Sequence, residues 1–474
     1  MALRRDTITP IKQINFQTVR FWLFTALLVA APLSKYPSVA TPLYNFTSFR
    51  IGLYPVLSLL FVLVSLPSLL KSILKLYEQS KTALISSCLL ALVCLLGLIT
   101  ALYKSRSTLL VASVLLLLSL LISAWWYVAY ELPTSKYKLL LKAVLIAGCV
   151  YGVVGLLQFV LAGFGHETFG LLCKNCGAQI FGFPRVNGFA AEPQFFANAM
   201  MIYFFVGLGA FYKTRSGLAL SSTVLSLLAI GLTFSRGAFL AVGLSTILFF
   251  ALLRLQDQVR LKTLAKHFAV LIAACLVISA LFVGAASYRY RGTPDIAYKT
   301  FRSMVQQASV GLIKLPASKS ETGDFTPAGF IEASGQERLD AANLSLKAWS
   351  YNGYTRLFGV GTGNLGPFVV KNISPSAPNN LTVYIFYVLL LSELGLIGAG
   401  AFVVLHVSIL KSYIKRFWRH KYTAIYTGLF CLGVAFLIQY FFFGSYINVP
   451  YIWLWFGILI GSKPLLRRKA VKAL

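Results

Sequence analysis

Long apolar segments, separated by short polar junctions, make up most of this sequence. In the segment between Arg215 and Arg254, Arg236 is the single charged side chain. Because about 20 apolar residues cross the hydrocarbon of a bilayer, this segment is long enough for two helices joined near its middle. The pattern therefore predicts a helical hairpin with Arg236 at its tip.

The same reasoning predicts an all-α polytopic membrane protein with about twelve transmembrane helices, forming a single integral membrane domain over residues 1–474. The expected spans are residues 20–34, 50–70, 82–101, 108–128, 139–163, 193–211, 217–234, 236–253, 268–287, 380–410, 422–444 and 448–463. Residues 380–410 exceed one crossing, so we expect that helix to tilt or to lie partly at the interface.

Composition supports this class, with 58% hydrophobic and 12% charged residues and a mean hydropathy of +0.76. An ordinary soluble domain is excluded. Lysine and arginine cluster at alternate junctions, which the positive-inside rule places in the cytoplasm together with both termini. The net charge of +30 therefore requires no nucleic-acid partner, since it directs topology and attracts anionic membrane lipids.

Two long polar segments are expected on the outer face, at residues 164–191 and 288–378. The first contains Cys173 and Cys176. This lone C-x-x-C favours a local disulfide over half of a zinc site, because no second Cys or His pair accompanies it. No metal site is expected elsewhere in the chain.

The second segment is far longer than an ordinary loop and is predicted to contain short helices. Apolar residues recur at helical spacing from Tyr298 to Leu312, which predicts an amphipathic helix at the membrane interface. Pro316–Gly329 is expected to be flexible, and Glu337–Trp349 to form a second helix. The loop is either a packed lid or a substrate-binding element, and its basic character favours binding.

Arg185 and Glu192 precede the span that begins near Pro193, and they share the outer face with Arg236. Taken singly, Glu192 is a helix cap and the arginines are interfacial anchors. An ionisable residue near lipid is costly, however, and therefore a functional candidate. The chain has only 13 acidic residues, so an acid placed beside two arginines favours a joint site.

A glycine-rich turn and an asparagine pair end the large loop. Gly361, Gly363 and Gly366 match G-x-G-x-x-G, but no βαβ unit surrounds them, which excludes a dinucleotide site. We expect a tight turn whose N–H groups approach a ligand. Asn379 or Asn380 is expected to cap the following span or to contact a sugar hydroxyl.

Four stretches, in this order, resemble the O-antigen ligase-like family of bacterial envelope polymerases and ligases. They are Arg185-x-x-Gly-Phe-x-x-Glu-Pro, Thr233-Phe-Ser-Arg-Gly-Ala, Arg338 followed by Trp349 and Gly359-Val-Gly-Thr-Gly-Asn, and Asn380 through Glu393-Leu-Gly-Leu-Ile-Gly. The resemblance implies a glycosyltransferase without metal or cofactor. It would transfer a glycan from undecaprenyl diphosphate to a saccharide or glycolipid acceptor at the outer face of the bacterial plasma membrane.

One departure bears on the acceptor. Family ligases carry a His-Asn pair at the end of the large loop, where this chain has Asn379-Asn380. The resemblance therefore favours a polymerase of repeat units, or a ligase to another acceptor, over a lipid A–core ligase.

The resulting hypothesis assigns Arg236 and Arg185 to the diphosphate and Glu192 to the acceptor proton. Arg338 is a further phosphate donor, and Asn379, Asn380, Gly361 and Gly363 complete the expected substrate-binding set. The alternative is a transporter or flippase of lipid-linked sugars or small anions, which predicts two similar halves and polar residues at mid-membrane depth. A membrane scaffold predicts no cost from changing Arg236.

Overall fold

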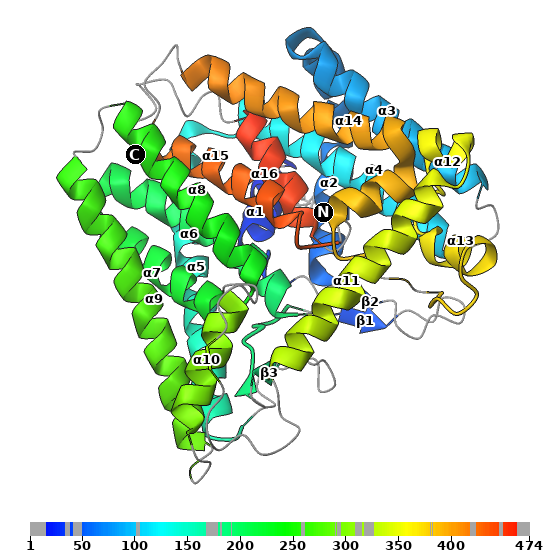
Figure 1. Cartoon of the computed structure of the whole chain (residues 1–474). Coiled ribbons are helices and arrows are strands. Elements are labelled where there is room, and N and C mark those ends of the chain that lie inside the picture. The colour runs from blue at the N-terminus through cyan, green and yellow to red at the C-terminus, as the bar shows by residue number, and fades with distance from the viewer. Residues whose placement is uncertain are drawn as a thin grey trace, which may run out of the picture.

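The structure, a computed structural model, packs helices into one bundle (Figure 1). It describes residues 16–33, 38–40, 50–100, 105–166, 179–180, 183–190, 192–256, 261–289, 291, 295–308, 315–316, 327–379, 381, 383–417, 423–444 and 449–461.

Within these residues, seven helices are long and apolar enough to cross a membrane. They are α2 (Leu53–Gln79), α3 (Lys81–Thr100), α4 (Ser105–Trp126), α5 (Tyr137–Gly163), α6 (Pro193–Thr214), α8 (Arg236–Leu255) and α14 (Phe386–Phe417). Shorter apolar helices lie in α1 (Phe16–Val29), α7 (Gly217–Leu232), α9 (Leu261–Arg289), α15 (Ala424–Gln439) and α16 (Pro450–Gly461). Each expected span overlaps one of these helices. The fold is therefore that of a helical membrane protein, and the count of twelve crossings stays a prediction.

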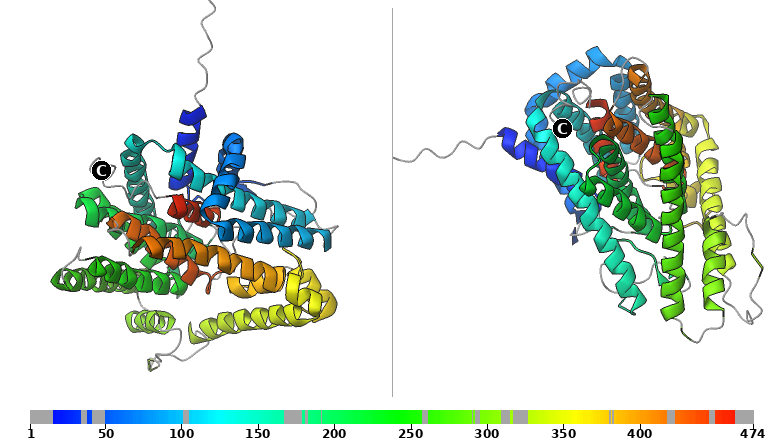
Figure 2. Two further views of the ribbon diagram at one scale, coloured as in Figure 1. Left: turned by 90° about the horizontal axis from the view of Figure 1, so that it is seen from above. Right: turned by 90° about the vertical axis from the view of Figure 1, so that its left-hand side faces the viewer.

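The other elements are short or lie outside the bundle. They are β1 (Ser38–Ala40) paired antiparallel with β2 (Arg50–Gly52), β3 (Gln179–Ile180) paired antiparallel with β4 (Phe183–Pro184), a π-helical turn (Tyr127–Glu131), a 3-10 turn (Thr134–Lys136), α10 (Ile296–Ala308), α11 (Pro327–Ser350), α12 (Gly353–Phe358) and α13 (Leu365–Asn372). Helices α10 and α11 run along the outside of the bundle (Figure 2).

Both helices expected in the large loop are present, but one differs in length. The helix expected over Tyr298 to Leu312 is α10. The helix expected over Glu337–Trp349 is α11, which already begins at Pro327. Pro327–Gly329 are therefore helical, and the prediction of a flexible segment reaching Gly329 was wrong at its end. Proline suits this first turn, where its missing N–H has no helical partner.

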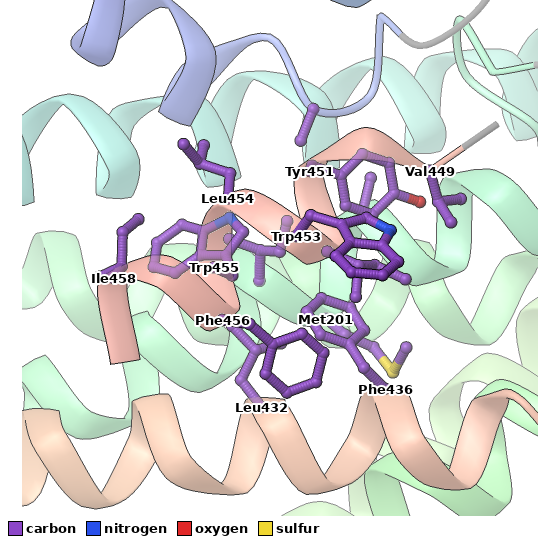
Figure 3. Close-up of a cluster of buried hydrophobic side chains, with 14 of the residues drawn as sticks. Met201, Leu432, Phe436, Val449, Tyr451, Trp453, Leu454, Trp455, Phe456 and Ile458 are labelled. Carbon is purple, nitrogen blue, oxygen red and sulfur yellow. The ribbon is translucent and has the colours of Figure 1, made fainter. Parts of the chain in front are cut away.

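The core of the bundle surrounds α6, which packs against α5, α7 and α15. A side chain at Gly428 of α15 would collide with the carbonyl oxygen of Phe205 in α6. Small residues at such crossings let membrane helices approach closely. Helix α16 adds aromatic side chains to this core, and the ring of its Tyr451 lies 6.4 Å from that of Phe436 in α15 (Figure 3). Helix α6 is therefore closely packed at the centre of the bundle.

Helix α14 departs from the expected 380–410 span in two ways. It begins at Phe386, so Asn379 is not its N-cap as predicted, and Asn380 lies outside the described residues. It is also broken at Gly395, whose φ of 63° and ψ of −170° favour glycine. Helix α14 therefore consists of two helical segments joined at this kink, and Glu393 lies just before it.

Candidate functional site

The hairpin predicted around Arg236 is confirmed, because α7 ends at Leu232 and α8 begins at Arg236. The turn between them passes through Phe234, which is buried and has a φ of 49°. A bulky residue rarely adopts this left-handed conformation, and it persists only where surrounding contacts hold it. The turn is therefore a point of backbone strain. We call the side of the molecule where this turn lies the hairpin end.

Arg185 is fastened to this turn by hydrogen bonds. Its Nε donates to the carbonyl oxygen of Thr233 at 2.7 Å, and its Nη2 donates to that of Phe234 at 3.0 Å. The backbone N–H of Val186 donates to the carbonyl oxygen of Leu232 at 3.2 Å. These bonds satisfy carbonyl groups at the C-terminus of α7 that have no helical partner. The Arg185 guanidinium is thus oriented by protein groups and is more than an anchor that reaches for water.

Gln158 of α5 holds the loop that follows Arg185. Its Oε1 accepts from the N–H groups of Asn187 at 3.0 Å and Gly188 at 2.8 Å, and its Nε2 donates to Asn187 Oδ1 at 2.8 Å. Gly188 has a φ of 54°, as expected for the second residue of an Asn-Gly turn. Gln158 was not among the predicted site residues, because a lone amide in an apolar helix gives no local sign of its hydrogen-bond partner.

Glu192 ends this loop at the N-cap position of α6, followed by Pro193 in the first turn as predicted. Its side chain makes no capping hydrogen bond and is exposed. The expectation that Glu192 serves as a cap is therefore wrong for the side chain, although its charge still benefits from the helix dipole. The carboxylate remains available at the hairpin end.

Arg338 reaches the same place from α11. Its guanidinium lies over the ring of Tyr384, 4.9 Å from the ring centroid, which is a favourable cation–π arrangement. Its Nε is buried and has no hydrogen-bond partner among the described residues. A buried donor without an acceptor is costly and calls for an explanation. Tyr384 is the second residue of this site that the sequence analysis missed.

The charges of Arg185, Arg236, Arg338 and Glu192 act on one another. Burial, which has the largest effect, and the charges of Arg236 and Arg338 together lower the pKa of Arg185 to about 10, and Glu192 opposes them. Burial also lowers the pKa of Arg338, while Tyr384 and Glu192 raise it. Within the described part of the chain, none of the three arginines forms a salt bridge. The cluster therefore has surplus positive charge at neutral pH.

Close backbone contacts position the elements around this arginine cluster. A side chain at Gly237, in the first turn of α8, would collide with Phe442 after α15. Gln194 Nε2 donates to the carbonyl oxygen of the same Phe442 at 2.6 Å. A side chain at Gly444 would collide with the carbonyl oxygen of Val383, the neighbour of Tyr384. These contacts tie the starts of α6 and α8 to the segment that carries Tyr384.

The glycine-rich turn does not offer the free N–H groups that we expected. Gly361 and Gly363 have φ angles of 92° and 75°, so the turn itself is confirmed. The N–H of Gly361 donates to the carbonyl oxygen of Glu393 at 2.9 Å, and that of Gly363 donates to Glu393 Oε1 at 2.8 Å. Because both donors have acceptors in α14, the turn is a clamp between the loop and the bundle. This argues against the predicted substrate-binding role of Gly361 and Gly363.

Several predicted positions lie apart from the cluster or outside the described residues. Asn379 is exposed and contacts Gly366 of α13 through its carbonyl group. Cys173, Cys176 and Asn380 lie outside the described residues. Among the residues that are described, no group of three or more His, Cys, Asp or Glu is placed to hold a metal ion.

Comparison with known proteins adds no relative. No protein-family model matches the chain, and a search of curated proteins finds no significant match.

Proposed function

We propose that this chain is a membrane glycosyltransferase of the O-antigen polymerase or ligase type. It transfers a glycan from an undecaprenyl-diphosphate carrier to a saccharide or glycolipid acceptor, at the outer face of a bacterial plasma membrane. The observation that carries the proposal is the arginine cluster. Three guanidinium groups from separate regions of the chain converge beside one exposed carboxylate, without a salt bridge among the described residues to neutralise them.

A lipid diphosphate suits this cluster in charge and in geometry. Arginine presents a planar fork of donors that binds phosphate oxygens bidentately, and it stays charged at neutral pH. Arg185 is already oriented by Thr233 and Phe234, and Arg338 has a buried Nε without a partner. Preorganised donors of this kind stabilise charge that develops on a leaving group. A bound diphosphate would also relieve the repulsion among the three arginines.

The proposed step needs only the donor, the acceptor and these side chains. An acceptor hydroxyl oxygen attacks the anomeric carbon of the carrier-linked glycan, and a new glycosidic C–O bond forms. The bond from the anomeric carbon to the phosphate oxygen breaks, and its electron pair leaves with the diphosphate. Glu192 takes the proton of the attacking hydroxyl. Alignment of the two substrates supplies much of the remaining rate enhancement.

The resemblance to the O-antigen ligase-like family supports the same activity, since three of its four stretches supply Arg185, Arg236 and Arg338. The chain has Asn379-Asn380 where family ligases have a His-Asn pair. Within the proposal, this favours repeat-unit polymerisation or an acceptor other than lipid A–core.

The direct test uses purified protein in lipid nanodiscs with an undecaprenyl-diphosphate-linked oligosaccharide. We expect release of undecaprenyl diphosphate, together with longer products on a gel. A variant with Arg236→Gln should release little, whereas Arg254→Gln, at the other end of α8, should release as much as wild type. Movement of intact lipid-linked sugar across vesicles, with no diphosphate released, would replace this proposal by the transporter alternative.

A further inference from the structure

An open apolar groove lies between the C-terminal ends of α5 and α9 and encloses about 510 Å³. Its walls include Phe159 and Gly163 of α5, Phe164 directly after α5, and Leu281, Gly284 and Tyr288 of α9. The volume falls within the range of about 300–1,000 Å³ typical of ligand pockets. An apolar groove on a membrane helix bundle suits a hydrocarbon chain.

The glycines of this groove do not serve helix packing. In membrane bundles, glycine usually brings two helix backbones into contact. Here a Cβ added at Gly163 or at Gly284 would have no heavy atom within 4 Å. The two glycines therefore keep the groove open instead of closing α5 onto α9.

The groove adjoins the arginine cluster across a single aromatic layer. The ring of Phe282 in α9 lies 5.6 Å from that of Phe159, which lines the groove. The same ring lies 4.2 Å from that of Phe234. The carbonyl oxygen of Phe234 accepts a hydrogen bond from Arg185. A molecule with a hydrocarbon tail and an anionic diphosphate would match both features at once.

We propose that the α5–α9 groove binds the polyprenyl tail of the carrier whose diphosphate is held by the arginine cluster. This inference rests on the proposed function and adds the site at which the carrier chain is recognised. The long undecaprenyl chain can bury more apolar surface in such a groove than a short prenyl tail can. Binding in the groove therefore makes the KM of the donor depend on tail length.

The test fills the groove from one wall. Gly284→Phe adds a ring to open space, and replacing glycine within a helix favours folding. The matched control is Gly243→Phe, because Gly243 of α8 is also open and lies outside the groove. Each protein is assayed with two donors that carry the same glycan, one on undecaprenyl diphosphate and one on a diphosphate with a two-isoprene tail.

We expect wild type and Gly243→Phe to show a lower KM for the long-tail donor. Gly284→Phe should raise that KM at least tenfold, to the value for the short-tail donor, and should leave the kcat and the short-tail KM within twofold. Gly163→Leu, from the opposite wall, should act in the same way. If both groove variants keep the tail-length preference of wild type, the groove holds bulk lipid and this inference is wrong. If wild type releases diphosphate from neither donor, the proposed function fails instead.

Discussion

Arg236→Lys tests the arginine cluster most directly, because it keeps the positive charge and removes the planar fork of donors. Arg236 is half-buried at the first position of α8, and its charge interacts with that of Arg338. An ammonium group there would contact one phosphate oxygen where the guanidinium contacts two. The substitution therefore separates charge from geometry.

We expect the loss of one bidentate contact in this half-buried site to cost about 2–4 kcal/mol of transition-state stabilisation. That corresponds to a fall in turnover of roughly 30- to 900-fold. The assay is release of undecaprenyl diphosphate in nanodiscs at saturating donor. Yield and thermal stability should match wild type, since among the described residues no salt bridge involves Arg236.

The matched control is Arg254→Lys, which makes the same change in the last turn of α8. It should retain full turnover. Full turnover in Arg236→Lys as well would show that the side chain is an interfacial anchor, and the assignment of the diphosphate to this cluster would be refuted.

Four further predictions follow from the structure. Inorganic diphosphate at 100 times its Kd should stabilise wild type by about 2.7 kcal/mol, seen as a higher Tm, and Arg338→Gln should bind it at least tenfold more weakly; equal Tm shifts would contradict the cluster. Because the pKa of Arg185 is lowered to about 10, its charge is complete below pH 9 and lost as pH rises through 10. The affinity for diphosphate, measured by titration calorimetry, should therefore fall as pH rises through 10. Gly395→Ala should lower the free energy of unfolding by about 1–3 kcal/mol, since the residue would keep a positive φ; an unchanged denaturation midpoint would refute this. A cysteine replacing the exposed Ser376, in a background without native cysteines, should react with an impermeant maleimide on intact spheroplasts, and labelling only after permeabilisation would reverse the proposed topology.

The helices were predictable because their signal is local. Apolar segments of sufficient length define each helix, and Arg236 interrupts one of them at the point where the hairpin turns. Arg185 and Glu192 were also predicted as candidates, from charge in a chain with few acidic residues, and Arg338 was predicted from its place in the large loop. A joint site of Arg185, Glu192 and Arg236 was predicted from their shared face, whereas the electrostatic interaction of Arg338 with Arg185 and Arg236 was found only in the structure.

The remaining features depend on contacts between distant segments. Gln158 forms a hydrogen bond with Asn187, and the ring of Tyr384 lies against the Arg338 guanidinium. The sequence around Gln158 or Tyr384 does not distinguish either residue from other polar or aromatic residues in apolar segments. The glycine spacing at Gly361 and Gly363 predicted a turn correctly but gave no direction for its N–H groups. A sequence pattern constrains backbone angles. The acceptor of a hydrogen bond, in contrast, depends on which distant groups the tertiary structure brings close to the donor.

The clamp between the glycine-rich turn and Glu393 also acts mechanically on Arg338. Helix α11 ends at Ser350, close to α12 and the clamp, and Arg338 lies 12 residues earlier, about 18 Å along the helix axis. A tilt of about 5° at the clamped end would swing the guanidinium by about 1.6 Å, whereas a hydrogen bond tolerates about 0.5 Å. Helix α11 also packs against α14 and α10, so the position of Arg338 depends on contacts along the helix as well as at its end. We therefore expect that breaking the clamp, at Gly361 or at Glu393, would also change the position of the Arg338 guanidinium, although neither residue belongs to the arginine cluster.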